Sequence, residues 1–141
     1  MKRICFLSHF VLCLATAAGA FAAWRAGALE AIWLADKSRV TSAIGALLAG
    51  TLAWLGVQAW IADSNPDIPA DASWGFLAAE LCLVLGVIGM AFGLALQGHT
   101  IAHNGDAVFE AWAAQLTATI CGCAAYAILL IASHNVDRAR Q

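Results

Sequence analysis

The chain of 141 residues is 62% hydrophobic and only 11% charged, and its mean hydropathy of +0.80 excludes a soluble globular domain of ordinary composition. Its formal net charge of -2 at pH 7 argues against a basic protein that binds nucleic acid. The five cysteines are odd in number and lie inside apolar stretches, so a disulfide framework is not expected. The sequence therefore predicts an all-α integral membrane protein, a bundle of about four transmembrane helices with a short interfacial helix in a single domain over residues 1–141.

The first predicted span covers residues 4–24, where a long apolar run follows Lys2 and Arg3. This stretch also has the pattern of a secretory signal peptide, because a basic start and an apolar run precede the cleavage-like triplet Ala20-Phe21-Ala22. The run is long enough to cross a bilayer, and we favour a retained helix. If residues 1–23 were a cleaved signal peptide, three spans would remain.

A short interfacial helix is predicted at about residues 26–36. Leu29, Ile32 and Trp33 recur there at helical spacing among charged residues. An apolar stripe with a tryptophan at headgroup depth is typical of a helix that lies on the membrane surface.

The second span is predicted at residues 41–62. Gly45 pairs with Ala49, and Ala46 with Gly50, in two interleaved small-x-x-x-small patterns. Such patterns allow another backbone to approach closely, so we expect a close-packing face on this helix.

The third span is predicted at residues 74–97, after a polar turn that holds both prolines of the chain. It is apolar on every side, yet it carries Gly86, Gly89 and Gly93, and the last two form a G-x-x-x-G pair. These glycines predict a packing helix. Glu80 near its start is costly in lipid unless it faces protein, water or the headgroups.

A second polar loop is expected after this span, around His99, His103 and Asp106. The two histidines have the i, i+4 spacing of metal ligands. No glutamate follows the first histidine, and Gly105 argues against a continued helix, so we expect no metal site.

The last span is predicted at residues 108–133. Ala118 and Gly122 lie on a stripe of small residues at four-residue steps, and Gln115 and Thr119 lie on the next stripe. Polar groups therefore gather along the edge of a close-packing face.

The two glycine-bearing spans together resemble the MotA/TolQ/ExbB family of proton-channel subunits over about residues 79–135. One family span reads close to Leu-Gly-Leu-Leu-Gly-Thr-Val-x-Gly, and here it is Leu85-Gly86-Val87-Ile88-Gly89-Met90-Ala91-Phe92-Gly93. A later family span reads roughly Ala-Leu-x-x-Thr-x-x-Gly-Leu. Here Gln115-Leu116-Thr117-Ala118-Thr119-Ile120-Cys121-Gly122 keeps the Leu, the Thr and the Gly, and Asn135 follows.

The resemblance implies a homo-oligomeric ring of five subunits in the bilayer, with a separate single-span acidic partner inside it, conducting protons or transducing ion-motive force. The ion pathway would use Thr119, Thr117, Gln115 and Glu80. Helix packing would use Gly86, Gly89, Gly93, Ala118 and Gly122. The chain departs from the family in having Met90 where a threonine is expected, and in lacking the large cytoplasmic region.

Two other classes stay open: a structural packing subunit of a membrane complex without ion flux, and a holin-like pore-forming protein. No enzymatic activity, metal or cofactor is expected, because no oriented triad, phosphate-binding glycine loop or metal-ligand set is present in the sequence. Four spans place both termini on one side, and the basic residues at the two ends favour the cytoplasmic side of a bacterial inner membrane.

Overall fold

The structure, a computed structural model, contains five helices and confirms the predicted all-α class. It describes residues 4–36, 38–65, 68–103 and 107–138, and within these all side chains except those of residues 35, 99–103, 107–111, 113 and 114. The helices are α1 (Ile4–Arg25), α2 (Ala28–Ala35), α3 (Val40–Ser64), α4 (Ser73–His103) and α5 (Ala107–Arg138). Four of them, all but α2, are long and apolar enough to cross a membrane.

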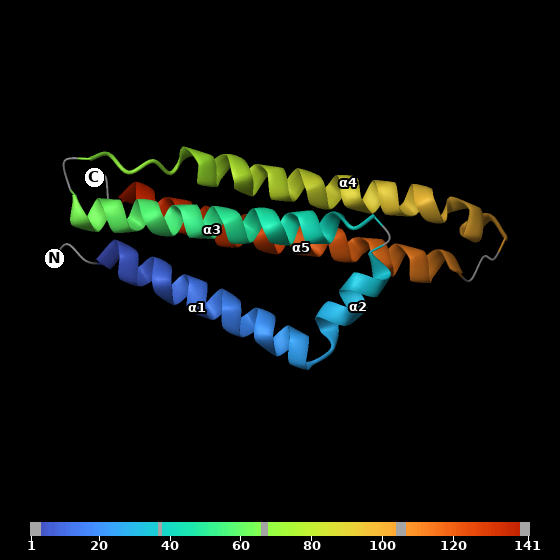
Figure 1. Cartoon of the computed structure of the whole chain (residues 1–141). Coiled ribbons are helices and arrows are strands. Elements are labelled where there is room, and N and C mark those ends of the chain that lie inside the picture. Colours follow the sequence, from blue (N-terminus) through green and yellow to red (C-terminus); the bar gives the residue numbers. More distant parts are fainter. Residues whose placement is uncertain (1–3, 37, 66–67, 104–106, 139–141) are drawn as a thin grey trace.

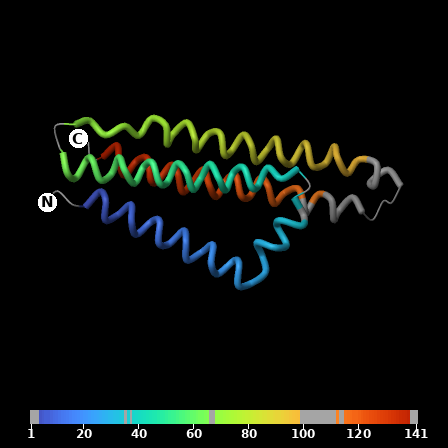
Figure 2. Tube along the Cα trace, in the orientation of Figure 1, coloured from blue at the N-terminus to red at the C-terminus, as the bar shows by residue number. Residues whose placement is uncertain are grey.

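The long helices α3, α4 and α5 lie side by side, and α1 joins them obliquely (Figure 1). α4 and α5 form an antiparallel hairpin that extends past the start of α3 (Figures 1 and 2). α1 approaches the bundle at its own N-terminal end and diverges from it towards Arg25, and α2 leads the chain back (Figure 1). The start of α1 and the end of α5 lie at the same end of the molecule.

The core lies between α3 and the α4–α5 hairpin. On α3 the buried residues Ile44, Thr51, Leu55 and Ala59 recur at steps of seven, four and four, which is one face of a helix. Leu129 of α5 is fully buried and belongs to the same hydrophobic cluster. Small and branched side chains therefore fill the centre of a three-helix bundle.

The outer surface of the bundle is apolar. Large hydrophobic side chains are exposed on every long helix, among them Phe10, Phe21, Val57, Val84, Val87, Phe92, Ile120 and Ile131. A soluble monomer rarely exposes so large an apolar surface, whereas a bilayer covers it at no cost. Together with the four long apolar helices, this surface indicates an integral membrane protein.

The helix ends differ from the predicted ones at several places. α2 begins only after Gly27, which has the left-handed φ of 73° that glycine tolerates. α4 continues to His103 and α5 to Arg138, beyond the predicted ends at 97 and 133. A polar residue marks where a chain leaves the membrane, but the helix itself continues until its backbone hydrogen bonding is interrupted.

Asp36 organises the connection between α2 and α3. Its carboxylate is buried and accepts hydrogen bonds from the Ser38 amide (3.1 Å), the Ser38 hydroxyl (2.6 Å) and the Thr41 amide (2.7 Å). Burial raises the pKa of Asp36, but these hydrogen bonds outweigh it and the net pKa is lowered from the usual 3.8. Asp36 thus caps the start of α3. In the same connection the Arg39 guanidinium lies 5.3 Å from the centre of the Trp33 ring.

The small-residue stripe predicted to be a close-packing face of α3 has no neighbour within the described chain. A methyl group added at Gly45 or at Gly50 would meet no heavy atom of the described residues within 4 Å. α3 instead turns the face with Ile44 and Leu55 towards the bundle. Branched side chains such as Ile44 and Leu55 make more van der Waals contacts than a stripe of glycine and alanine, which favours packing through this face.

Candidate functional site

The glycines of α4 and α5 meet at backbone distance. A methyl group added to Gly122 would lie 2.6 Å from the Cys82 carbonyl oxygen and 3.0 Å from the Gly86 Cα. One added to Gly86 would lie 3.0 Å from the Ala118 carbonyl oxygen and 3.2 Å from the Gly122 Cα. We call this contact, made by Cys82, Gly86, Ala118 and Gly122, the α4–α5 seam. A side chain at Gly122 would require the backbone to move, and one at Gly86 would be tighter than an ordinary contact.

Gly89 and Gly93 make room for side chains of different residues. At Gly89 an added methyl group would lie 3.0 Å from the Val40 side chain of α3 and 3.2 Å from the Ala118 Cβ. At Gly93 it would collide with the amide group of Gln115. The G-x-x-x-G pair therefore makes room for one aliphatic and one polar side chain, and the backbone contact lies at Gly86 instead.

Thr119 joins the seam through a hydrogen bond between helices. Its Oγ1 donates to the carbonyl oxygen of Gly86 at 3.2 Å, and the residue is half-buried. The carbonyl of Gly86 already accepts a bond within α4, so the hydroxyl uses its second lone pair. The hydroxyl is thus held at the edge of the seam, on the border between buried and exposed surface.

Gln115 is fully buried one helical turn from Thr119. Neither its Oε1 nor its Nε2 has a hydrogen-bond partner among the described residues. A buried amide without partners costs about 1–3 kcal/mol. The residue therefore has unused capacity for two donors and one acceptor, beside Gly93.

The other two predicted ion-pathway residues lie apart from this pair. Thr117 is half-buried on the side of α5 that also carries Asn135, because eighteen residues are about five full turns. Glu80 is exposed on α4, about six residues or roughly 9 Å along the axis from Gly86. Gln115 and Thr119 thus come together, whereas Thr117 and Glu80 do not join them.

The hairpin has one side that no other described helix covers. Glu80 lies about half a turn around α4 from Gly89, which contacts α3. The side of α4 that carries Glu80 continues onto α5, and both helices have exposed residues there. We define the open face as Glu80, Val84 and Val87 of α4 with Leu116, Ile120 and Cys123 of α5. Thr119 lies between this face and the seam.

A second group of polar contacts attaches the start of α1. The Ser8 hydroxyl donates to the Asn135 Oδ1 at 2.6 Å, and the Asn135 Nδ2 donates to the Cys5 carbonyl at 2.9 Å. The Phe6 amide donates to the Asp63 Oδ2 at 2.9 Å, which caps α1 from the end of α3. Sequence reasoning did not predict these contacts, although an asparagine near the end of an apolar span was a signal that a polar partner exists.

His9 completes this attachment deeper in the bundle. It is almost fully buried, and its Nε2 lies 3.0 Å from the Leu52 carbonyl and 3.4 Å from the Cys13 sulfur. The ring fits because Gly56 has no side chain: a methyl group there would lie 3.3 Å from the Nε2. A bond to a carbonyl requires the proton on Nε2, which leaves Nδ1 without a partner among the described residues.

The described side chains include no group of three His, Cys, Asp or Glu residues arranged to hold a metal ion. The side chains of His99 and His103, and Asp106 altogether, lie outside the described part. Comparisons of the chain with protein-family models, with curated proteins and with solved structures found no match. The functional assignment therefore depends on the geometry of the chain itself and on the residue patterns of α4 and α5.

Proposed function

We propose that the chain is a ring-forming subunit of the MotA/TolQ/ExbB type, which moves protons or transduces ion-motive force together with a single-span acidic partner. In this proposal the open face of the α4–α5 hairpin is directed towards the centre of a five-membered ring in a bacterial inner membrane, and both termini are cytoplasmic. α1, α2 and α3 lie on the other sides of the hairpin, towards lipid.

The position of Glu80 carries the proposal. Its carboxylate lies about seven residues, or roughly 10 Å, inside α4 from Ser73, and it is exposed on the side away from α3. An ionisable side chain in a span is expensive in hydrocarbon and is normally directed at protein or water. A central, partly hydrated hole supplies that environment, whereas the hydrocarbon around a lipid-facing hairpin does not.

Thr119 and Gln115 have defined roles in this proposal. The Thr119 hydroxyl, at the edge of the open face, would exchange its bond to Gly86 for one to water or to the partner's acid. The Gln115 amide, which has no partner among the described residues, would hold a water molecule beside it, since buried water commonly satisfies such groups. Met90 contributes only a thioether, a weak acceptor, so Thr119 is the principal hydroxyl.

Water access to Cys123 can be measured in the unmodified protein, and this measurement tests the proposal. All five cysteines lie in the described part of the chain, and Cys123 alone is exposed. Full-length protein in liposomes is treated with a charged, water-soluble maleimide, and the labelled mass is measured. We expect one label per chain, which Cys123→Ser removes. No labelling in the bilayer, with labelling restored after denaturation, would contradict the proposal because it would place the open face in lipid.

One observation favours the second candidate, a structural packing subunit without ion flux. The Thr119 hydroxyl already donates to the Gly86 carbonyl, and this bond is sufficient to explain the residue as a packing contact without a role in ion flux. Proton uptake into liposomes separates the two: Thr119→Val keeps the shape but removes the donor. Flux that falls for Thr119→Val but not for Thr16→Val, whose hydroxyl donates to the Leu12 carbonyl in lipid-facing α1, supports the ring subunit. Measurable flux that is equal in the parent and in both variants would contradict the role of Thr119.

A further inference from the structure

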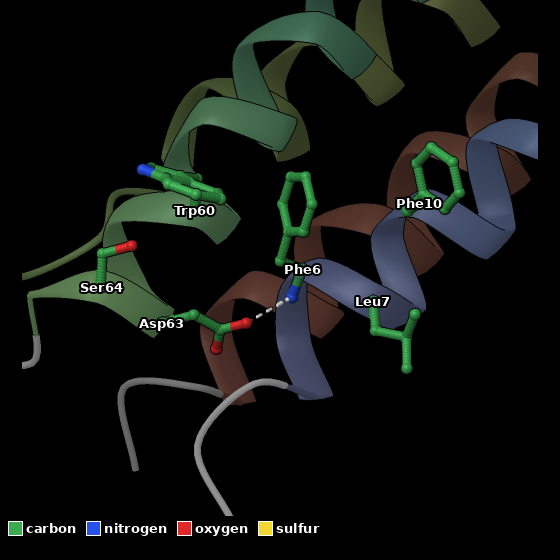
Figure 3. A pocket seen from close by; sticks show the side chains of 6 residues that line it. All are labelled: Phe6, Leu7, Phe10, Trp60, Asp63 and Ser64. Carbon is green, nitrogen blue, oxygen red and sulfur yellow. Dashed lines mark hydrogen bonds between the residues drawn. The ribbon is translucent and has the colours of Figure 1, made fainter.

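A pocket lies between the start of α1 and the end of α3, lined by side chains of these two helices, with α5 passing behind it (Figure 3). Its volume is about 660 Å³, within the usual range for small-molecule sites. The lining residues are Phe6, Leu7 and Phe10 of α1 with Trp60, Asp63 and Ser64 of α3. The Phe6 and Trp60 rings pack edge to face, with centroids 5.4 Å apart.

The pocket is polar at one end and apolar at the other. Asp63 and Ser64 are at the last turn of α3, where the chain leaves the membrane for the proline-containing turn. Leu7 and Phe10 lie farther along α1, towards the middle of the bilayer, and both are exposed. This order, from carboxylate through tryptophan to aliphatic and aromatic surface, follows the order of headgroup, interface and acyl chain in a lipid.

Asp63 is the only charged side chain among the described residues that line the pocket. One of its oxygens, Oδ2, accepts a hydrogen bond from the Phe6 amide, and its other oxygen accepts none from the described residues. Figure 3 shows the carboxylate between the ends of the two helices, with the Trp60 ring above it. A carboxylate oxygen without a partner among the described residues, in the same pocket as an exposed tryptophan ring, suits a cation through charge attraction and the ring face together.

We propose that this pocket binds a phospholipid whose headgroup carries a primary ammonium, of the phosphatidylethanolamine type. The ammonium donates to the free oxygen of Asp63 and lies near Trp60, and one acyl chain runs along Leu7 and Phe10. The bound lipid would fill the space between α1 and α3 and hold α1 against the bundle. This site is independent of the proposed ion pathway, because none of its residues belongs to α4 or α5.

Native mass spectrometry of the full-length protein tests the proposal. The protein is equilibrated with equal amounts of dioleoylphosphatidylethanolamine and its N-acetylated derivative, in which an uncharged amide replaces the ammonium. We expect about two- to fivefold more of the ammonium lipid retained, the ratio that an exposed charge pair or cation–π contact gives. An equal ratio for the unmodified protein would overturn the proposal and indicate non-specific annular lipid.

Variants locate the site. Asp63→Asn keeps an oxygen for the Phe6 amide and should bring the ratio to about one. Ser64→Lys leaves Asp63 in place but adds a competing ammonium, and should also bring the ratio to about one. Glu30→Gln removes an exposed carboxylate from α2 and should leave the ratio unchanged. A preference that persists in both pocket variants would overturn the assignment to Asp63.

Discussion

The α4–α5 seam and the attachment of α1 are two different solutions to holding helices together in lipid. At the seam, Gly86 and Gly122 remove side chains so that the two backbones touch. At the attachment, Ser8 and Asn135 add polar groups that bond across the helices. Lipid gives helices no hydrophobic reason to associate, so either close packing or hydrogen bonding must supply the association.

The difference predicts two kinds of failure. A seam held by shape tolerates no added atom, whereas an attachment held by hydrogen bonds tolerates added volume but not the loss of a donor or acceptor. It also predicts two kinds of motion: the hairpin should act as one rigid body, and α1, which diverges from the bundle beyond its first turns, should be able to separate from it.

The largest effect is expected at the seam. Gly122→Ala places a methyl group 2.6 Å from the Cys82 carbonyl, and overpacking against backbone should lower the free energy of unfolding by about 3 kcal/mol. Unfolding in a denaturing detergent, followed by circular dichroism, measures this change. Gly50→Ala is the matched control: it has free space and should be neutral or stabilise by up to about 1 kcal/mol. Equal effects of the two substitutions would contradict the seam.

The next effect is expected at the attachment. Asn135→Leu removes the bonds to Ser8 and Cys5 and should cost about 1–2 kcal/mol, the upper part of the range for polar contacts between membrane helices. A double-mutant cycle with Ser8→Ala isolates the shared bond, and we expect a coupling energy of about 0.6 kcal/mol or more. Additive single effects would show that Ser8 and Asn135 do not interact.

A smaller effect, of opposite sign, is expected at Gln115. Gln115→Met keeps the volume and removes an amide that has no partner among the described residues, so in the isolated chain it should raise the free energy of unfolding by about 1 kcal/mol. Denaturing-detergent titration measures it. The same substitution should lower proton flux if the amide holds water beside Thr119. Destabilisation of the isolated chain would instead mean that the amide is already satisfied.

The smallest effect is expected at Asp36, and it depends on pH. Because hydrogen bonding lowers the pKa of Asp36 on folding, its stabilisation is fully present above pH 3.8 and is lost as the pH falls through the lower folded pKa. The unfolding midpoints of the parent and of Asp36→Asn should therefore differ at pH 6, and this difference should shrink as the pH falls below 3.8. A difference that grows on acidification would contradict the cap at the start of α3.

The sequence was sufficient to predict the class of fold and the helices that span the membrane, because length and apolar composition alone decide both. It also identified Gly86 and Gly122 as packing residues, which the structure brings into contact. The partner of each glycine could not be predicted: Gly93 accommodates the Gln115 amide rather than a backbone, and Gly45 and Gly50 face open space. A pattern of small residues predicts where another helix can come close. Which residue of which helix does so depends on how far the helices are shifted along one another.

The polar contacts were harder to predict for a different reason. Asp36, Asp63 and Asn135 each bond to residues whose proximity depends on where helices end and how they are staggered. A single polar residue in an apolar span predicts that some partner exists, yet the three-dimensional arrangement alone identifies Ser8 and Cys5. For the same reason Thr117 and Thr119, only two residues apart, lie on different sides of α5.

The number of chains in the assembly tests the central proposal most directly. Full-length protein, extracted in a mild detergent, is measured by native mass spectrometry. The proposed ring predicts one discrete species of five copies, with the open face of α4 and α5 enclosed. A monomer or dimer would contradict the ring and leave the seam as packing within one chain, and a broad ladder of large species would indicate a holin-like pore.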